Sequence, residues 1–194
     1  MKKSFYTLAI LLCFLTLTSN AQLQKGYYLI GGDVANLDFS LNSGNAFIMN
    51  ITPKVAWFIR DNVAVGAFVD FGLSTAKGAG TTVNYGIGPL ARYYFPGATG
   101  TVARITRLFL EGNVGIQGVN PAHGGSTNGL GLGVGPGLAY FVTNDISLEA
   151  LFKYTGLIGF GSDPTSSRLQ LGLGFQVYLP RSKVRAEMRR IENK

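Results

Sequence analysis

The sequence predicts an all-β fold, an antiparallel up-and-down barrel of eight strands. Apolar residues alternate with polar or small ones from Lys25 onward, and no helical period of useful length appears before the C-terminal tail. Of the 194 residues, 27 are Gly and only 14% are charged, against about 25% in an ordinary soluble domain. The length allows one domain, with enough residues to bury a core or to close a barrel.

The N-terminal residues 1–21 have the pattern of a cleavable signal peptide. Two lysines precede an apolar run at residues 8–17, and Ser19 and Ala21 are the small residues at the expected cleavage site. The run is about half the ~20 residues that a membrane-spanning helix needs. We therefore expect the segment to be removed, which leaves a barrel domain at residues 22–180 and a C-terminal tail.

The basic charge of the chain is concentrated in that tail, residues 181–194. The formal net charge is +7, and the tail alone holds six Lys and Arg against two Glu. Because the rest of the chain is nearly neutral and lacks a platform of interleaved aromatic and basic residues, we expect no binding of nucleic acid. Two interpretations of the tail remain, a short amphipathic helix on anionic headgroups or a solvated terminus.

The first half of the predicted barrel contains four strands. The first covers residues 25–40, with a β-bulge expected at the pair Gly31–Gly32, where the alternation is interrupted. The second and third cover residues 47–60 and 63–74 and are joined by a tight turn rich in Asp and Asn. The fourth covers residues 83–95.

The second half contains four more strands, predicted at residues 108–119, 130–142, 146–155 and 169–179. The segment 130–142 has the plainest alternation, with Gly at every second position from Gly131 to Gly137. A small barrel has an interior only just wide enough for side chains, so large residues require small ones beside them. We expect these glycines to make room for bulky inward side chains, namely Phe68, Arg92 and Tyr94.

One face of the predicted sheet is apolar throughout, and the other is polar but poor in charge. A soluble lipocalin-like barrel would turn the apolar face inward around a ligand, whereas a membrane barrel turns it outward. The polar face is too sparsely charged for the water-facing coat of a soluble protein, so we predict a transmembrane barrel. Its inward charges are expected to pair as a polar plug formed by Lys54, Asp70, Arg92, Glu111, Glu149 and Lys153.

Aromatic residues gather at strand ends that an up-and-down barrel places on one rim. Trp and Tyr prefer the membrane–water interface, because one part of the ring system is apolar and another can form hydrogen bonds. The expected girdle consists of Tyr27, Trp57, Tyr93, Phe95, Tyr140 and Tyr178.

The connections predict how the barrel is oriented. If the N-terminus is periplasmic, the turns at 60–62 and 143–145 lie on the periplasmic side and are short. The connections at 120–129 and 157–167 then lie on the cell-surface side, and they are longer and rich in Gly. The connection at 96–106 departs from this rule, because it is long although it lies on the periplasmic side.

The sequence offers little enzymatic chemistry. His123 and Ser126 lie in one predicted loop, and with Glu111 they form the best candidate for a nucleophilic set, as in a lipid-modifying enzyme. A solvated loop His beside two glycines is the favoured interpretation. The single His and single Cys cannot form a Cys/His zinc site, and no Gly-x-Gly-x-x-Gly motif opens a helix. We expect no catalytic residue, no cofactor and no metal.

With its signal-like N-terminus and the repeating pattern of residues 25–180, the chain resembles the small eight-stranded outer-membrane β-barrel proteins of Gram-negative bacteria, of OmpX or OmpA-barrel type. The stretches at 131–141 and 143–150 look like the outer-membrane β-barrel domains common in Bacteroidota.

The resemblance implies insertion by the outer-membrane assembly machinery, with residues 175–179 as the assembly signal. It also implies contact with outer-membrane lipids and lipopolysaccharide. We expect a monomeric, non-enzymatic protein of the outer membrane with a structural or surface-interaction role carried by its extracellular loops. The alternatives are a lipid-modifying enzyme of the same membrane and a soluble periplasmic carrier.

Overall fold

The computed structural model describes residues 23–39, 47–76, 80–96, 105–160 and 166–182, together with the single residues 78, 184, 189 and 191. The expected signal peptide, residues 1–21, lies outside the described residues, as does most of the 96–106 connection. The described tail residues are helical. No helix in the described part of the chain is long and apolar enough to cross a membrane.

Eight strands account for the described body of the chain. They are β1 (Tyr27–Phe39), β2 (Phe47–Arg60), β3 (Val63–Ala76), β4 (Gly80–Tyr94), β5 (Thr106–Asn120), β6 (Thr127–Phe141), β7 (Ile146–Gly159) and β8 (Ser166–Pro180). With 13 to 15 residues each, they exceed the about 9–11 residues that a tilted strand needs to cross a bilayer.

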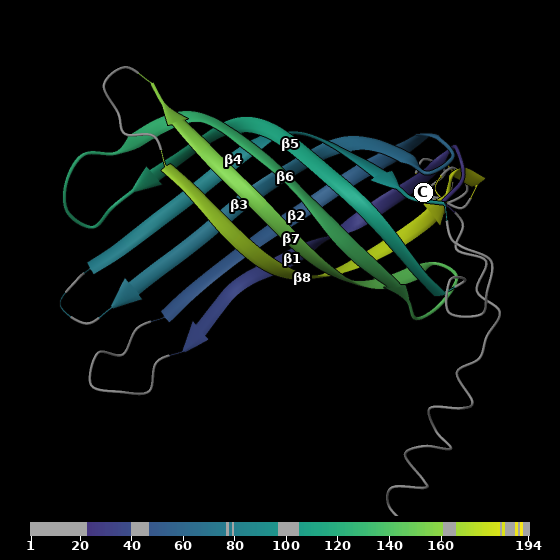
Figure 1. The fold of residues 1–194 in the computed structure, drawn as a ribbon, viewed down its shortest axis with the longest axis horizontal. Coiled ribbons are helices and arrows are strands. Elements are labelled where there is room, and N and C mark those ends of the chain that lie inside the picture. Colours follow the sequence, from purple (N-terminus) through teal and green to yellow (C-terminus); the bar gives the residue numbers. More distant parts are fainter. Residues whose placement is uncertain are drawn as a thin grey trace, which may run out of the picture.

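Each strand pairs antiparallel with the next, and β8 returns to β1 and closes the barrel. The closing register runs from Tyr27 opposite Pro180 to Ala35 opposite Gly172. Figure 1 shows the tilted strands wrapped around a single axis, with the C-terminus at the right-hand end. We call this end, where β1 begins and β8 finishes, the inner end, and the opposite end the outer end. The predicted eight-stranded antiparallel barrel is confirmed.

Side chains alternate strictly between the barrel interior and its outer surface. Along β6 every second residue from Gly129 to Phe141 is buried, and all of these but Phe141 are Gly or Ala, while the intervening side chains, mostly Leu and Val, face outward. Leu132 is 46% exposed and Leu171 is 60% exposed, whereas Gln170 lines an interior cavity. This orientation is opposite to the one that a lipocalin-like carrier requires, because the leucines are outside the barrel and the polar face is inside.

The glycines of β6 make room for different side chains from those expected. A Cβ atom added to Gly137 would enter the ring of Phe109, and one added to Gly131 would meet the side chain of Gln117. The side chains expected to need this space are Phe68, Arg92 and Tyr94, and none of them is among the contacts at these two glycines. Phe109 and Gln117 lie on β5, the hydrogen-bonded partner strand. Gly129 and Gly135 instead allow close approach of the β7 backbone.

The irregularity of β1 lies further along the strand than predicted. Its pairing with β2 is continuous through Gly31 and Gly32, and the register shifts between Ala35 and Asp38. The two glycines are explained by close approach instead, because an added Cβ would meet backbone atoms of β8 at Gly31 and of β2 at Gly32.

Candidate functional site

A cluster of aromatic side chains closes the inner end of the barrel. Tyr178 is fully buried there, with its ring 5.2 Å from that of Phe141 and 6.2 Å from that of Phe58. Leu23, which precedes β1, packs into the same cluster, and its carbonyl accepts a hydrogen bond of 2.8 Å from the amide of Asn62. We call this cluster of Leu23, Phe58, Phe141 and Tyr178 the floor. Within it, the side chain of Tyr178 does not reach the outer surface of the barrel.

The expected girdle is therefore wrong at two of its six positions. Tyr178 is inside the barrel, and Tyr27 packs against the interior cluster. Tyr28, the neighbour of Tyr27, faces outward instead and stacks on Trp57 at 6.5 Å between ring centroids. A position at the rim does not decide the face of a side chain, whereas the alternation does, and Tyr178 belongs to the face of the inward Gln176.

The other members of the girdle lie on the outside of the barrel at the inner end. The four predicted girdle residues with exposed side chains are Trp57, Tyr93, Phe95 and Tyr140. The rings of Tyr93 and Phe95 meet edge to face at 5.2 Å.

Arg92 is the centre of a buried polar network directly above the floor. Its guanidinium donates to Glu111 at 2.6 Å from β4 to the adjacent β5, and to Glu149 at 2.7 Å across the lumen on β7. It also donates to the hydroxyl of Tyr94 at 2.9 Å and lies 4.1 Å from the ring centroid of Phe109. Arg92 therefore joins the floor to both carboxylates.

Lys54 extends the network toward β1. It forms an ion pair with Asp33 and donates to the Glu111 oxygens at 2.7 and 3.0 Å. Glu149 in turn accepts from the hydroxyls of Tyr178 at 2.9 Å and Ser147 at 3.1 Å. Buried charges are tolerated only when they are paired and hydrogen-bonded, and every charged group of this network meets that condition. We call these residues the plug: Asp33, Lys54, Arg92, Glu111, Ser147, Glu149 and Tyr178.

The structure brings together four of the six charged residues expected to pair, namely Lys54, Arg92, Glu111 and Glu149. Asp70 and Lys153 lie above the plug and line a cavity whose deep end is formed by Asp33 of the plug. Sequence reasoning missed Asp33. The signal was present, since Leu29, Gly31 and Asp33 share the inward face of β1, but the bulge expected at the glycines obscured it.

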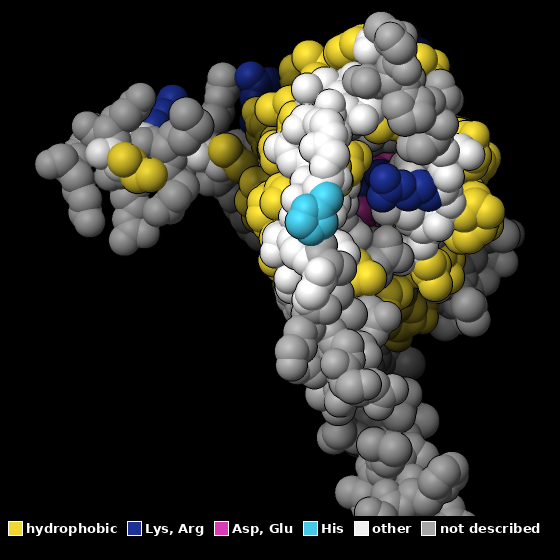
Figure 2. All heavy atoms as spheres, turned by 90° about the vertical axis from the view of Figure 1, so that its left-hand side faces the viewer, with side chains coloured by type: hydrophobic (Ala, Val, Ile, Leu, Met, Phe, Trp, Pro, Cys, Tyr) yellow, Lys and Arg dark blue, Asp and Glu magenta, His cyan; other side chains and the backbone are white. Residues whose placement is uncertain are grey.

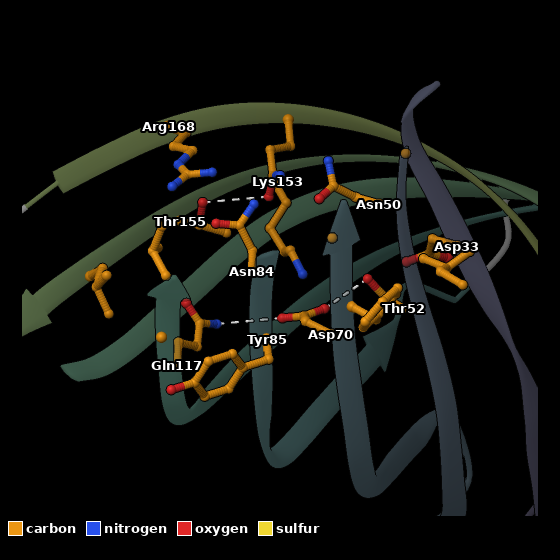
Figure 3. A pocket seen from close by; sticks show the side chains of 18 of the residues that line it. Asp33, Asn50, Thr52, Asp70, Asn84, Tyr85, Gln117, Lys153, Thr155 and Arg168 are labelled. Carbon is orange, nitrogen blue, oxygen red and sulfur yellow. Dashed lines mark hydrogen bonds between the residues drawn. The ribbon is translucent and has the colours of Figure 1, made fainter. Parts of the chain in front are cut away.

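Above the plug, the outer half of the interior is a polar cavity of about 100 Å³, which we call the vestibule. Asp70 accepts a hydrogen bond from the Thr52 hydroxyl at 2.7 Å and one from the Gln117 amide at 3.4 Å (Figure 3). Lys153, Arg168 and Asn84 also line it. Figure 2 looks onto the outer end and shows a hollow with a basic side chain at its edge and an acidic one deeper inside.

The three candidate catalytic residues, His123, Ser126 and Glu111, do not form one site. His123 and Ser126 are exposed on the connection between β5 and β6. Glu111 lies in the plug, where Lys54 and Arg92 occupy its carboxylate. Within the described ranges, no hydrogen bond joins His123 to either of the other two. In the same residues, no group of three His, Cys, Asp or Glu side chains is placed to hold a metal ion.

No protein-family model matches the sequence, and no curated protein matches it. Among solved structures, the chain is similar to Neisserial surface protein A, with a TM-score of 0.53 and 22% sequence identity over 79% of this chain and 97% of that one. It is also similar to the N-terminal β-barrel domain of OprF from Pseudomonas aeruginosa, with a TM-score of 0.52 and 16% identity over 80% of this chain and 98% of that one. The chain has the fold of a small eight-stranded outer-membrane barrel. The likeness to Bacteroidota sequences stays a prediction.

Proposed function

We propose that the protein is an integral outer-membrane barrel without enzymatic activity, which holds its outer loops at the cell surface for a structural or surface-interaction role. The observation that supports this most directly is the apolar outer wall, which includes exposed Leu, Ile, Val, Phe or Tyr side chains on every strand. An exposed apolar surface this extensive is unfavourable in water, whereas lipid tails satisfy it. The proposed partners are therefore outer-membrane lipids and lipopolysaccharide.

The plug and the floor support a scaffold role over a transport role. Arg92 and Tyr178 are both fully buried and occupy the lumen of the inner half, so the vestibule ends blindly. A filled eight-stranded barrel is a packed core and not a pore. In this proposal the inner end faces the periplasm, the outer-membrane assembly machinery inserts the chain, and the protein acts as a monomer.

Membrane fractionation and fluorescence test the membrane location. The chain has one tryptophan, and Trp57 stands on the outside near the inner end. We expect recovery of the protein only with detergent and, after reconstitution, quenching of Trp57 by lipids brominated near the headgroup more than by lipids brominated at the chain ends. Recovery in a detergent-free soluble extract would overturn the proposal, and so would Trp57 emission that brominated lipids leave unchanged.

Conductance across a planar bilayer tests the blind interior. A sealed barrel gives no stable channel steps at neutral pH, whereas regular ohmic steps from the reconstituted protein would exclude the scaffold role.

A lipid-modifying enzyme is the second candidate, motivated by His123 and Ser126 on one outer connection. We expect His123→Ala to leave the lipid profile of the envelope unchanged relative to the unaltered protein. A change in that profile would support the enzyme and contradict our proposal.

A further inference from the structure

We propose that the vestibule binds a small oxyanion, a phosphate or a carboxylate, between the side chains of Lys153 on β7 and Arg168 on β8. The inference rests on the barrel fold and the vestibule, and not on the proposed role of the outer loops.

Lys153 is the first observation that points to a ligand. It is 8% exposed and lines the vestibule, yet it makes no hydrogen bond or ion pair with any described residue. It interacts with Glu111 only over a longer distance, and that carboxylate already accepts from Lys54 and Arg92. Because no described carboxylate lies within ion-pair distance of this ammonium group, an anion that entered the vestibule would gain a charge-assisted contact with it.

The acids of the vestibule do not supply that partner. Asp70 is held by Thr52 and Gln117 on the opposite wall, and Asp33 is paired with Lys54 in the plug. Asp33 is thus paired within the plug, and no ion pair joins Asp70 to Lys153. Figure 3 shows the side chains of Lys153 and Asp70 reaching into the vestibule from different strands, with no bond drawn between them.

The pairing of β7 with β8 places a second cation beside the first. Lys153 lies opposite Gln170, and Thr155 lies opposite Arg168, so Lys153 and Arg168 are diagonal neighbours on the inward face. Diagonal neighbours have Cβ atoms within about 8 Å, a spacing that long side chains bridge. Arg168 is exposed at the mouth and forms no ion pair with a described residue. The Arg168 guanidinium thus offers several hydrogen-bond donors at the mouth of the vestibule, and the Lys153 ammonium group offers a compact positive charge deeper inside.

Neutral donors complete the site. The Thr155 hydroxyl donates to the Gln170 carbonyl oxygen at 3.5 Å, which leaves the Gln170 amide nitrogen free to turn toward an oxyanion. Asn84 lines the same space. A volume of about 100 Å³ suits a compact solute, and a lipid headgroup is held outside the strand wall by its acyl chains. A soluble oxyanion is therefore the occupant that the geometry favours.

Calorimetric titration of the folded, detergent-purified protein with inorganic phosphate tests this proposal. At low ionic strength we expect saturable binding with one phosphate per chain. Lys153→Gln weakens the affinity roughly tenfold or more, because it removes a charge-assisted contact, and Lys153→Arg retains most of it. Arg168→Gln weakens the affinity less, because that side chain is more exposed. Arg60→Gln, at an exposed position of the inner end, is the matched control and leaves binding unchanged.

The outcomes separate cleanly. Absence of saturable binding to the unaltered protein would overturn the site, and so would equal affinities for the unaltered protein and Lys153→Gln. If Lys153→Gln fails to fold, as judged by β-sheet circular dichroism, Arg168→Gln decides, and an unchanged affinity in that variant counts against the proposal. The proposed membrane scaffold would survive such a result, since its tests do not involve phosphate.

Discussion

The inner and outer halves of the barrel interior are built from similar residue types but solve the problem of buried polarity in different ways. In the inner half Arg92 contacts two carboxylates and two aromatic rings, and the floor excludes water. In the outer half Asp70 has only uncharged hydrogen-bond partners, and Lys153 forms no hydrogen bond or ion pair with the residues that the structure describes. The inner half is thus a packed core that happens to be charged, whereas the outer half is a lined cavity.

The number of charged side chains that face the barrel interior therefore does not by itself indicate a plug. What matters is whether a charged side chain can meet others across the lumen. Arg92 and Lys54 do so because each contacts an acid on a strand that is not its neighbour. Asp70 does not, and its surroundings remain open. Substitutions in the two halves should therefore differ in their cost to stability.

The largest effect is expected for Arg92→Met in the inner half. Removing the guanidinium leaves Glu149 buried without a cation and Glu111 with only Lys54, a change that costs about 3–5 kcal/mol. Equilibrium urea unfolding in lipid vesicles, followed by Trp57 fluorescence, measures it. Arg60→Met at the exposed inner turn is the control and should change the unfolding free energy by less than about 0.5 kcal/mol. A loss no greater than that of the control would break the comparison.

We expect lipid to surround the outer wall of both halves. Val134 lies near the middle of β6 and faces outward, so Val134→Arg should cost about 2–4 kcal/mol when the barrel folds into vesicles. Gln170→Arg, which adds the same side chain to the vestibule wall, should cost much less because water reaches it. Equal costs for the two variants in the same unfolding assay would contradict a lipid-facing outer wall.

Two glycines of β6 compare the packing of the two halves, Gly137 in the inner half and Gly131 in the outer half. Gly137→Ala forces a methyl group into Phe109, which Arg92 and Tyr94 hold in place, and should cost about 1–3 kcal/mol. Gly131→Ala on the same strand meets Gln117, whose side chain can swing into the vestibule. We expect its cost to be at least twofold smaller by urea unfolding. A larger cost at Gly131 would mean that the outer half is as tightly packed as the inner half.

The smallest effect is expected for Asp70→Asn in the vestibule. The variant keeps an oxygen that accepts from Thr52 but loses the charge and the weak 3.4 Å acceptor contact with the Gln117 amide, so the unfolding free energy should fall by at most about 1 kcal/mol. Glu149→Gln in the plug provides the comparison, because Arg92 then loses a buried ion pair. Thermal unfolding of both variants in the same vesicles measures the difference. Asp70→Asn as destabilising as Glu149→Gln would show that the outer half also depends on paired charges.

The alternation of apolar and polar residues along the chain predicts much of this architecture. Alternation along one strand decides which residues share a face, and an apolar face free of charge predicts where lipid lies. The eight strands, their antiparallel order and the inward position of Lys54, Arg92, Glu111 and Glu149 follow from that local pattern. The error at Tyr178 arose where rim position was used in place of alternation, although the alternating pattern of β8 already placed this residue inward.

The strands and their two faces follow from the amino-acid pattern, because both depend on backbone geometry that repeats every two residues. Which side chains contact one another inside the barrel depends on the closed fold. Contacts such as that of Lys54 with Glu111, across the lumen from β2 to β5, depend on how the closed sheet staggers its strands. Stagger is a property of the whole barrel, and for that reason Asp33 lies in the plug, whereas Lys153 lies in the vestibule beyond ion-pair distance of every described acid.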